Sequence, residues 1–349
     1  MFELENIVRE NIKQMTPYSS ARHEFTGKAN VFLDANENAF GSPLPENYNR
    51  YPDPLQSTLK EKLSTIKNVP AQNIFLGNGS DEAIDLLFRI FCEPAIDNVI
   101  ILPPTYGMYQ VCADINKVAI KQVLLTIDFQ IDLPAVEKAI DANTKLIFIC
   151  SPNNPTGNTI NKRSIYSLLT TFNGLVVIDE AYIDYSTKGS FSTSLNDYPN
   201  LIILQTLSKA WGLAGLRLGM AFASENIINY FNKVKYPYNI NTVTQQLVLN
   251  ALLNQRIMQE WATTTIQQRE WLSQQLTVLP FTKIIYPSDA NFLLVKMAGA
   301  KKIYDHLCTK GIIVRDRSKV ILCDDCLRIT VGSPEENIIL MNELNNYTA

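Results

Sequence analysis

The sequence has few histidines, little net charge and no long apolar run, and each absence excludes a class of protein. The net charge of −3 gives no sign of a nucleic-acid or anionic-membrane partner. No apolar run approaches the roughly 20 residues of a membrane span, and the opening MFELENIVRENIKQM lacks the apolar segment of a signal peptide. The six cysteines are scattered along the chain. We therefore expect a cytoplasmic protein with free thiols.

Cysteine and histidine are too sparse for an obvious metal site. Cys323 and Cys326 have C-x-x-C spacing, but no second pair occurs, and the two histidines are His23 and His306. A structural zinc site needs about four ligands. We predict no metal and interpret LCDDCL as a polar turn between two strands.

Short apolar runs alternate with helical patterns over the first two-thirds of the chain, at residues 73–77, 98–102, 145–153, 174–182 and 201–206. Such runs are typical of strands buried on both faces, and the alternation predicts a mostly parallel sheet with helices on both sides. A helix-forming stretch at 242–276 and a shorter alternation follow. The predicted fold is α/β: an N-terminal arm (1–40) packing on the small domain, a large domain (41–240), and a linker helix with a smaller α+β domain (241–349).

Polar residues follow the predicted strands, where open α/β sheets bind ligands. We expect them to converge on one crevice: Ser80, Tyr106, Asn154, Asp179, Tyr182 and Lys209. Each alone has a structural explanation. The Gly79–Asp81 helix start and Asp179 could be caps, Asn154 a turn residue, and Lys209 a lysine whose amine reaches solvent. Arg217 could form a surface ion pair.

Taken together these residues predict one cofactor. A desolvated lysine amine has a lowered pKa and can form a Schiff base with an aldehyde, which is the role we predict for Lys209. The buried carboxylate of Asp179 would keep a pyridine nitrogen protonated. The cofactor with these features is pyridoxal 5′-phosphate. Its remaining contacts would come from a phosphate site (Gly79, Ser80, Asp81, Thr206, Ser208 and Arg217), ring-oxygen donors (Asn154 and Tyr182) and a stacking ring (Tyr106).

Three motifs give the chain a family resemblance over essentially its whole length. SPNNPTG, DEAY and SKAWGLAGLRLG occur in the order and spacing of the fold-type-I pyridoxal-phosphate aminotransferases. The resemblance implies that Lys209, Asp179 and Tyr182 are the catalytic residues. It also implies that Asn154 and Tyr182 bind the ring oxygen, and that Ser208 and Arg217 hold the phosphate.

A subfamily signal lies in LDANENAFGSP (33–43), NRYPDP (49–54) and LGNGSDEAID, which resemble the histidinol-phosphate aminotransferases. These enzymes of histidine biosynthesis exchange an amino group between L-histidinol phosphate and 2-oxoglutarate. The products are 3-(imidazol-4-yl)-2-oxopropyl phosphate and glutamate. The resemblance implies a homodimer in which Tyr51 reaches the neighbouring subunit's cofactor phosphate. The Gly-Asn-Gly-Ser turn departs from the commoner Gly-x-Gly-Ala, but backbone N–H groups do most of that binding.

The resemblance also names substrate-binding residues. Arg328 in LRITVG matches the family's carboxylate-binding arginine, which would hold glutamate in a bidentate pair and take the donor's phosphate in the other half-reaction. Arg315 would be a second cation for that phosphate. Tyr18, Asn38 and Tyr51 complete the predicted substrate contacts.

Three rival functions stay open at this stage. Threonine-phosphate decarboxylase, a lyase, resembles this family closely and also takes a phosphorylated substrate. An aminotransferase for aromatic or other amino acids would share the motifs. A non-catalytic protein on this scaffold would have lost Lys209 or Asp179, and both are present.

Overall fold

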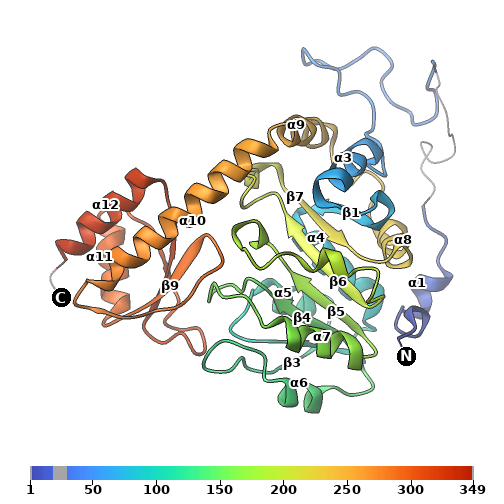
Figure 1. Ribbon diagram of the computed structural model, residues 1–349. Helices are drawn as coiled ribbons and strands as arrows, with labels where there is room; N and C mark the ends of the chain where they lie inside the picture. The colour runs from blue at the N-terminus through green and yellow to red at the C-terminus, as the bar shows by residue number, and fades with distance from the viewer. Residues whose placement is uncertain (1, 19–29, 348–349) are drawn as a thin grey trace.

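The computed structural model describes residues 2–18 and 30–347 and contains two β-sheets joined by a long helix (Figure 1). The larger sheet is formed by β1 (Ile74–Asn78), β2 (Asn98–Ile101), β3 (Ala119–Gln122), β4 (Thr144–Cys150), β5 (Leu175–Asp179), β6 (Leu201–Thr206) and β7 (Leu218–Phe222). Their order is β1-β7-β6-β5-β4-β2-β3. β7 is antiparallel to both of its neighbours, and the other pairs are parallel. The predicted fold class is confirmed.

Most strands of this sheet are buried on both faces because their side chains alternate between two cores. The edge strand β3 is partly exposed. In β4, Leu146 and Phe148 enter one core, and Ile147 and Ile149 enter the other. The first core lies under α4 (Gly79–Phe91), α5 (Met108–Ile115) and α8 (Glu225–Val234). The second lies under α3 (Ser57–Lys67), α6 (Leu133–Ala139), α7 (Lys162–Thr171) and α9 (Thr242–Leu252).

The smaller sheet is antiparallel throughout. Its strands are β8 (Thr282–Ile285), β9 (Phe292–Met297), β10 (Arg315–Asp316) and β11 (Cys326–Thr330), in the order β10-β11-β9-β8. A third core joins it to α11 (Ala300–Thr309) and α12 (Pro334–Asn345). Short 3₁₀ helices complete the chain: η1 (Leu4–Asn6), η2 (Ala71–Asn73), η3 (Ile183–Tyr185), η4 (Phe191–Ser194) and η5 (Ala214–Leu216).

The helix α10 (Gln255–Thr277) connects the two sheets (Figure 1). Its first turns place Met258 and Ala262 in a core of the larger sheet, and its last turns place Leu272 and Leu276 in the core of the smaller one. The sequence predicted one helix over 242–276. The structure has two, because the chain turns at Asn254, whose N–H donates to Ala251 O.

The described part of the N-terminal arm lies on the larger sheet's helices. α1 (Glu10–Gln14) and the residues before it place Ile7, Val8 and Ile12 in the core under α4 and α8. The prediction placed this arm on the smaller domain. Residues 4–14 lie on the larger one instead, because these three apolar side chains match the apolar faces of α4 and α8.

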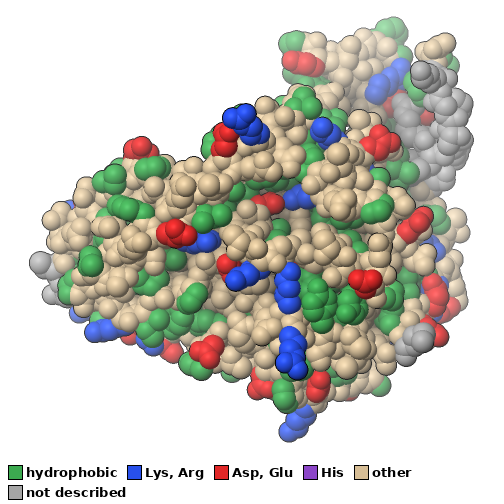
Figure 2. Space-filling model, in the orientation of Figure 1, with side chains coloured by type: hydrophobic (Ala, Val, Ile, Leu, Met, Phe, Trp, Pro, Cys, Tyr) green, Lys and Arg blue, Asp and Glu red, His purple; other side chains and the backbone are tan. Residues whose placement is uncertain are grey.

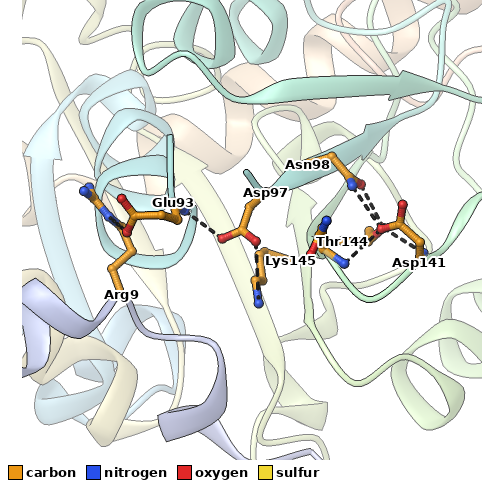
Figure 3. Close-up of polar contacts among 8 residues, drawn as sticks. Arg9, Glu93, Asp97, Asn98, Asp141, Thr144 and Lys145 are labelled. Atoms are coloured by element: carbon orange, nitrogen blue, oxygen red, sulfur yellow. Dashed lines mark hydrogen bonds and ion pairs between the residues drawn. The ribbon is translucent and has the colours of Figure 1, made fainter. Parts of the chain in front are cut away.

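Polar contacts hold this arm on the larger sheet at the amino ends of the parallel strands, opposite their carboxyl ends (Figure 3). Arg9 pairs with Glu93 at 3.1 Å, the Glu93 N–H donates to Asp97, and Asp97 faces Lys145 at 3.7 Å.

No helix of the described residues could cross a membrane. Acidic and basic side chains are interspersed on the face shown in Figure 2, as the small net charge predicts.

Candidate active site

A cavity of about 780 Å³ lies where the carboxyl ends of the parallel strands meet the smaller sheet. Most of the predicted site residues line it: Gly79, Ser80, Asp81, Tyr106, Asn154, Asp179, Tyr182, Thr206, Ser208, Lys209, Arg217, Arg315 and Arg328. The strand ends therefore bring together side chains that are far apart in the sequence, as the parallel topology requires.

Asp179 is the last residue of β5, and its carboxylate is buried. Tyr109 Oη donates to Oδ2 at 2.7 Å, and the Ala181 N–H donates to Oδ1 at 3.1 Å. Burial raises the pKa of Asp179, while these two donors act in the opposite direction. The site thus holds a buried carboxyl group that can share a proton with a ligand.

Lys209 follows β6 by three residues, and its amine enters the same cavity. Burial lowers the pKa of the amine, and the nearby positive charge of Arg328 lowers it further. The Nζ atom lies 5.4 Å from the centre of the Tyr182 ring. A lysine with a lowered pKa has more of its amine in the neutral, nucleophilic form, which is what Schiff-base chemistry requires.

A turn rich in hydrogen-bond donors lies at the start of α4. The Gly79 N–H donates to Arg217 O at 2.7 Å, and Arg217 Nη2 lies 3.5 Å from Asp81 Oδ2. The first N–H groups of a helix have no intrahelical acceptor and carry the positive end of the helix dipole. The hydroxyls of Thr206 and Ser208 are hydrogen-bonded to each other at 3.0 Å and line the same cavity. These donors suit a phosphate group.

This turn depends on a close approach of β7 to α4 at Gly219. A Cβ atom at Gly219 would lie 2.1 Å from Ser80 N and 2.2 Å from the carbonyl carbon of Gly79. No side chain can occupy that space. Because residue 219 is a glycine, β7 can pass very close to the start of α4. Arg217, the residue just before β7, therefore lies beside that helix start.

Three side chains form the cavity wall between the two sheets. Arg328 Nη1 donates to Asn154 Oδ1, so the smaller sheet contacts the SPNNPTG loop. The Tyr182 ring packs edge-on against Phe292 at 5.1 Å. Burial raises the pKa of Tyr182, so its hydroxyl stays protonated and can donate a hydrogen bond.

Tyr106 lies two residues before α5, and Tyr109 is the second residue of that helix. Tyr106 Oη donates to Asp81 Oδ1 at 3.1 Å, and the two rings pack edge to face at 5.6 Å. Tyr106 thereby exposes one ring face to the cavity, where a flat ligand can stack.

Three predicted residues lie elsewhere in the single chain. Tyr51 stacks on Tyr238 at 4.4 Å and lines a separate pocket of about 510 Å³. Tyr18 is 72% exposed. Asn38 accepts a hydrogen bond from the Phe40 N–H at 3.0 Å. Nothing in one chain brings these three to the cavity.

Two residues of the site were missed by the sequence analysis: Arg317, which lines the cavity, and Tyr109, which is fully buried and hydrogen-bonded to Asp179. Tyr109 looks like an ordinary core aromatic of a helix, and only its spacing of three from Tyr106 placed it near the site. Arg317 lines the cavity beside Arg315. The i, i+2 spacing in VRDR puts both on one side of a strand and was the available signal.

The donor set can be tested against the predicted cofactor. Pyridoxal 5′-phosphate needs an amine for its aldehyde, an anion site for its phosphate, a buried carboxylate for its ring nitrogen and an aromatic face for its ring. The cavity offers one of each, so the residues suit the cofactor. The described residues contain no cluster of potential metal ligands. Cys323 and Cys326 are free and buried; the chain turns between them, and Cys326 is the first residue of β11.

Comparisons with known proteins point to the same chemistry. The model of the family "Aminotransferase class I and II" matches residues 31–344. The chain is 52% identical to the histidinol-phosphate aminotransferase of Cytophaga hutchinsonii and 53% identical to that of Parabacteroides distasonis, in each case over 99% of both chains. Its fold is similar to the crystal structure of the histidinol-phosphate aminotransferase from Sinorhizobium meliloti in complex with pyridoxal-5′-phosphate (TM-score 0.79, 24% identity, 89% of each chain).

Proposed function

The chain belongs to the class I and II aminotransferases, and on that premise we propose that it transfers an amino group between L-histidinol phosphate and 2-oxoglutarate in histidine biosynthesis, with pyridoxal 5′-phosphate as cofactor. The observation that carries this proposal is the cavity itself. It combines a lysine of lowered pKa, a buried carboxylate, an anion-binding turn and, on the smaller sheet, a second cationic region.

The cavity residues divide into two groups by position. On the larger sheet, Asp179 would hold the ring nitrogen, Asn154 and Tyr182 the ring oxygen, and Tyr106 the ring face. The Gly79–Asp81 turn with Thr206, Ser208 and Arg217 would hold the cofactor phosphate. On the smaller sheet, Arg315 and Arg328 would hold the acidic end of the substrate. We assign these functions to the proposed domains 41–240 and 241–349.

Bound pyridoxal 5′-phosphate supplies an aldehyde that condenses with amines and a ring that accepts electrons from the substrate. Lys209 Nζ acts as the general base that removes the proton from the substrate carbon bearing nitrogen, and it later returns a proton. The burial that lowers the pKa of Lys209 favours the neutral amine that this transfer needs. Asp179, to which Tyr109 donates a hydrogen bond, would hold the ring nitrogen and favour its protonated form.

The substrates differ in the acidic group beside the reacting carbon. Glutamate and 2-oxoglutarate carry a carboxylate directly on that carbon, whereas histidinol phosphate carries its phosphate one carbon further away. A guanidinium can pair bidentately with either, so Arg328 can serve both half-reactions. Kinetics should therefore be ping-pong, with the two substrates using one cavity in turn.

We propose a homodimer in the cytoplasm. Support for the dimer comes from Tyr51, which lies outside its own chain's cavity, and from the exposed apolar side chains near it in sequence, Val31, Leu33 and Phe40. A second copy covering this segment would bury them and bring Tyr51 to the neighbouring cavity. Six unpaired cysteines support a reducing compartment.

A spectrum of one half-reaction tests the function. Cofactor-loaded protein is mixed with L-histidinol phosphate and no acceptor. We expect the yellow cofactor to convert to its aminated form, and 2-oxoglutarate to reverse the change. No change with this donor but a change with an aromatic amino acid would mean a different aminotransferase. Release of carbon dioxide from threonine phosphate would mean a lyase.

Mixed dimers test the subunit arrangement. Lys209→Ala and Tyr51→Phe subunits are each defective in a homodimer if Tyr51 acts across the interface. In a mixed dimer, the chain that keeps Lys209 receives an intact Tyr51 from its partner, so one site of two is restored. Recovery of activity on mixing supports the proposal, and its absence would mean that Tyr51 acts within its own chain or has no role.

A further inference from the structure

Three arginines of the smaller sheet face the cavity together. Arg315 and Arg328 lie opposite each other across the β10–β11 pair. Arg317 is two residues beyond Arg315, and its N–H donates to Cys326 O at 2.8 Å, so the strand pairing continues past β10. Residues i and i+2 share a face of a strand. All three side chains line the cavity.

This cluster of like charges has no compensating carboxylate in the described chain. None of the three arginines forms an ion pair with a described residue. The two acidic groups of the cavity are already engaged, Asp81 with Arg217 and Tyr106, and Asp179 with Tyr109. Like charges opposite each other on neighbouring strands are destabilising. An arrangement that persists at such a cost is typical of a binding site for an anion.

Some side-chain nitrogen atoms of these arginines have no hydrogen-bond acceptor among the described residues. Arg328 uses Nη1 on Asn154 Oδ1. The Nε atoms of Arg317 and Arg328 are both buried, and neither has a hydrogen-bond acceptor in the described chain. Burial lowers the pKa of Arg317, and the positive charges of Arg328 and Arg315 lower it further. A buried donor without an acceptor is unfavourable, and a bound anion would supply the acceptor.

The number of donors suits a phosphate better than a carboxylate. A carboxylate has two oxygens and one negative charge, and one guanidinium satisfies both oxygens. A phosphate monoester has three free oxygens and close to two negative charges near pH 7. We propose that Arg317 is a specificity-determining residue: it binds the third oxygen of the phosphorylated donor, and the carboxylate substrates do not need it. This inference rests on the proposed function and adds Arg317 to its site.

The test compares two substrates in one variant. In Arg317→Gln, kcat/KM for L-histidinol phosphate should fall about 10- to 100-fold, the loss expected for a hydrogen bond to a charged group. For glutamate, kcat/KM should change by less than about threefold. Arg317→Lys should lie between the variant and the parent, because it keeps the charge but not the planar fork. Arg256→Gln is the matched control, since Arg256 is exposed on α10 and paired only with Glu260.

Equal losses for both substrates would show that Arg317 only maintains the cavity, and no loss for either would show that it does not bind the donor; both results overturn the inference. A parent protein that rejects L-histidinol phosphate overturns the proposed function instead. Inorganic phosphate then serves as the probe. Phosphate should inhibit the glutamate half-reaction of the parent, and this inhibition should weaken in Arg317→Gln if Arg317 binds phosphate and stay unchanged if it does not.

Discussion

The hydroxyl of Tyr109 donates a 2.7 Å hydrogen bond to Oδ2 of Asp179, and both groups are buried. Burial raises the pKa of the carboxyl group and this bond lowers it. Tyr109→Phe removes only the second effect, so the pKa of Asp179 should rise and the carboxylate should be lost at a higher pH. We expect kcat to fall about tenfold and the acid limb of its pH profile to move to higher pH.

The measurement is the pH dependence of kcat for the glutamate half-reaction in the parent and in Tyr109→Phe. Tyr185→Phe, the loss of another buried hydroxyl outside the cavity, is the control. A lower kcat without movement of the acid limb would show that Tyr109 acts by packing and not through Asp179.

Replacement of Lys209 should abolish turnover while leaving the cofactor site formed. The phosphate, ring-nitrogen and ring-oxygen contacts proposed above all come from other residues. In Lys209→Ala we expect a loss of about 100- to 10,000-fold in kcat, with noncovalent cofactor retained through gel filtration and detected by its absorbance. Near-parent turnover in this variant would contradict the assignment of Lys209 as the base.

Two glycines offer a matched pair of substitutions. In Gly219→Ala the new Cβ would lie 2.1 Å from Ser80 N, so β7 and the start of α4 must separate. We expect a loss of about 1–3 kcal/mol in stability and at least tenfold weaker cofactor binding. In Gly215→Ala nothing lies within 4 Å of the added methyl group. Equilibrium dialysis and thermal unfolding of both variants check this, and equal behaviour of the pair would refute the role of Gly219.

A buried lysine should give the stability a distinctive pH dependence. Burial lowers the pKa of Lys60 to about 8, and the charge of Lys235 acts in the same direction. Between pH 8 and about 10.4 the unfolded chain therefore binds more protons than the folded one at this position, and the free energy of unfolding rises with pH through Lys60.

Lys60→Met removes this dependence. The variant should be more stable than the parent by about 1–3 kcal/mol at pH 7, and the difference should vanish toward pH 10.5. Urea unfolding at several pH values measures it. A difference that stays constant with pH would show that the charged form of Lys60 carries no penalty in the folded protein.

The positions of Asp179 and Lys209 could be predicted because Asp179 directly follows a run of apolar residues and Lys209 comes shortly after another. A charged group in that context has few structural explanations, and parallel strands bring their carboxyl ends together. Tyr109 could not be singled out, because a buried aromatic in an amphipathic helix is normal and only its partner distinguishes it. The strand β7 was missed as well, since LGMAF is short and directly continues the glycine-containing loop after Lys209.

The packing of the N-terminal arm could not be predicted from the sequence for a different reason. Its apolar residues at positions 7, 8 and 12 predict packing, but helices of both domains offer apolar faces, so the sequence pattern does not choose between them. Tyr18, Asn38 and Tyr51 show a third limit, because a contact made between two copies leaves no trace within one chain. The role of Tyr51 remains a prediction that the mixed-dimer experiment addresses, and the roles of Tyr18 and Asn38 remain predictions.

The groups proposed to hold the cofactor all belong to the larger sheet and its loops, whereas Arg315, Arg317 and Arg328 belong to one hairpin of the smaller sheet. Reaction chemistry and donor choice are therefore encoded in separate stretches of the gene. Changes confined to the β10–β11 hairpin could give a descendant a new donor without disturbing the amine-transfer machinery. The hairpin is thus the place to begin when redirecting this protein toward a different amine.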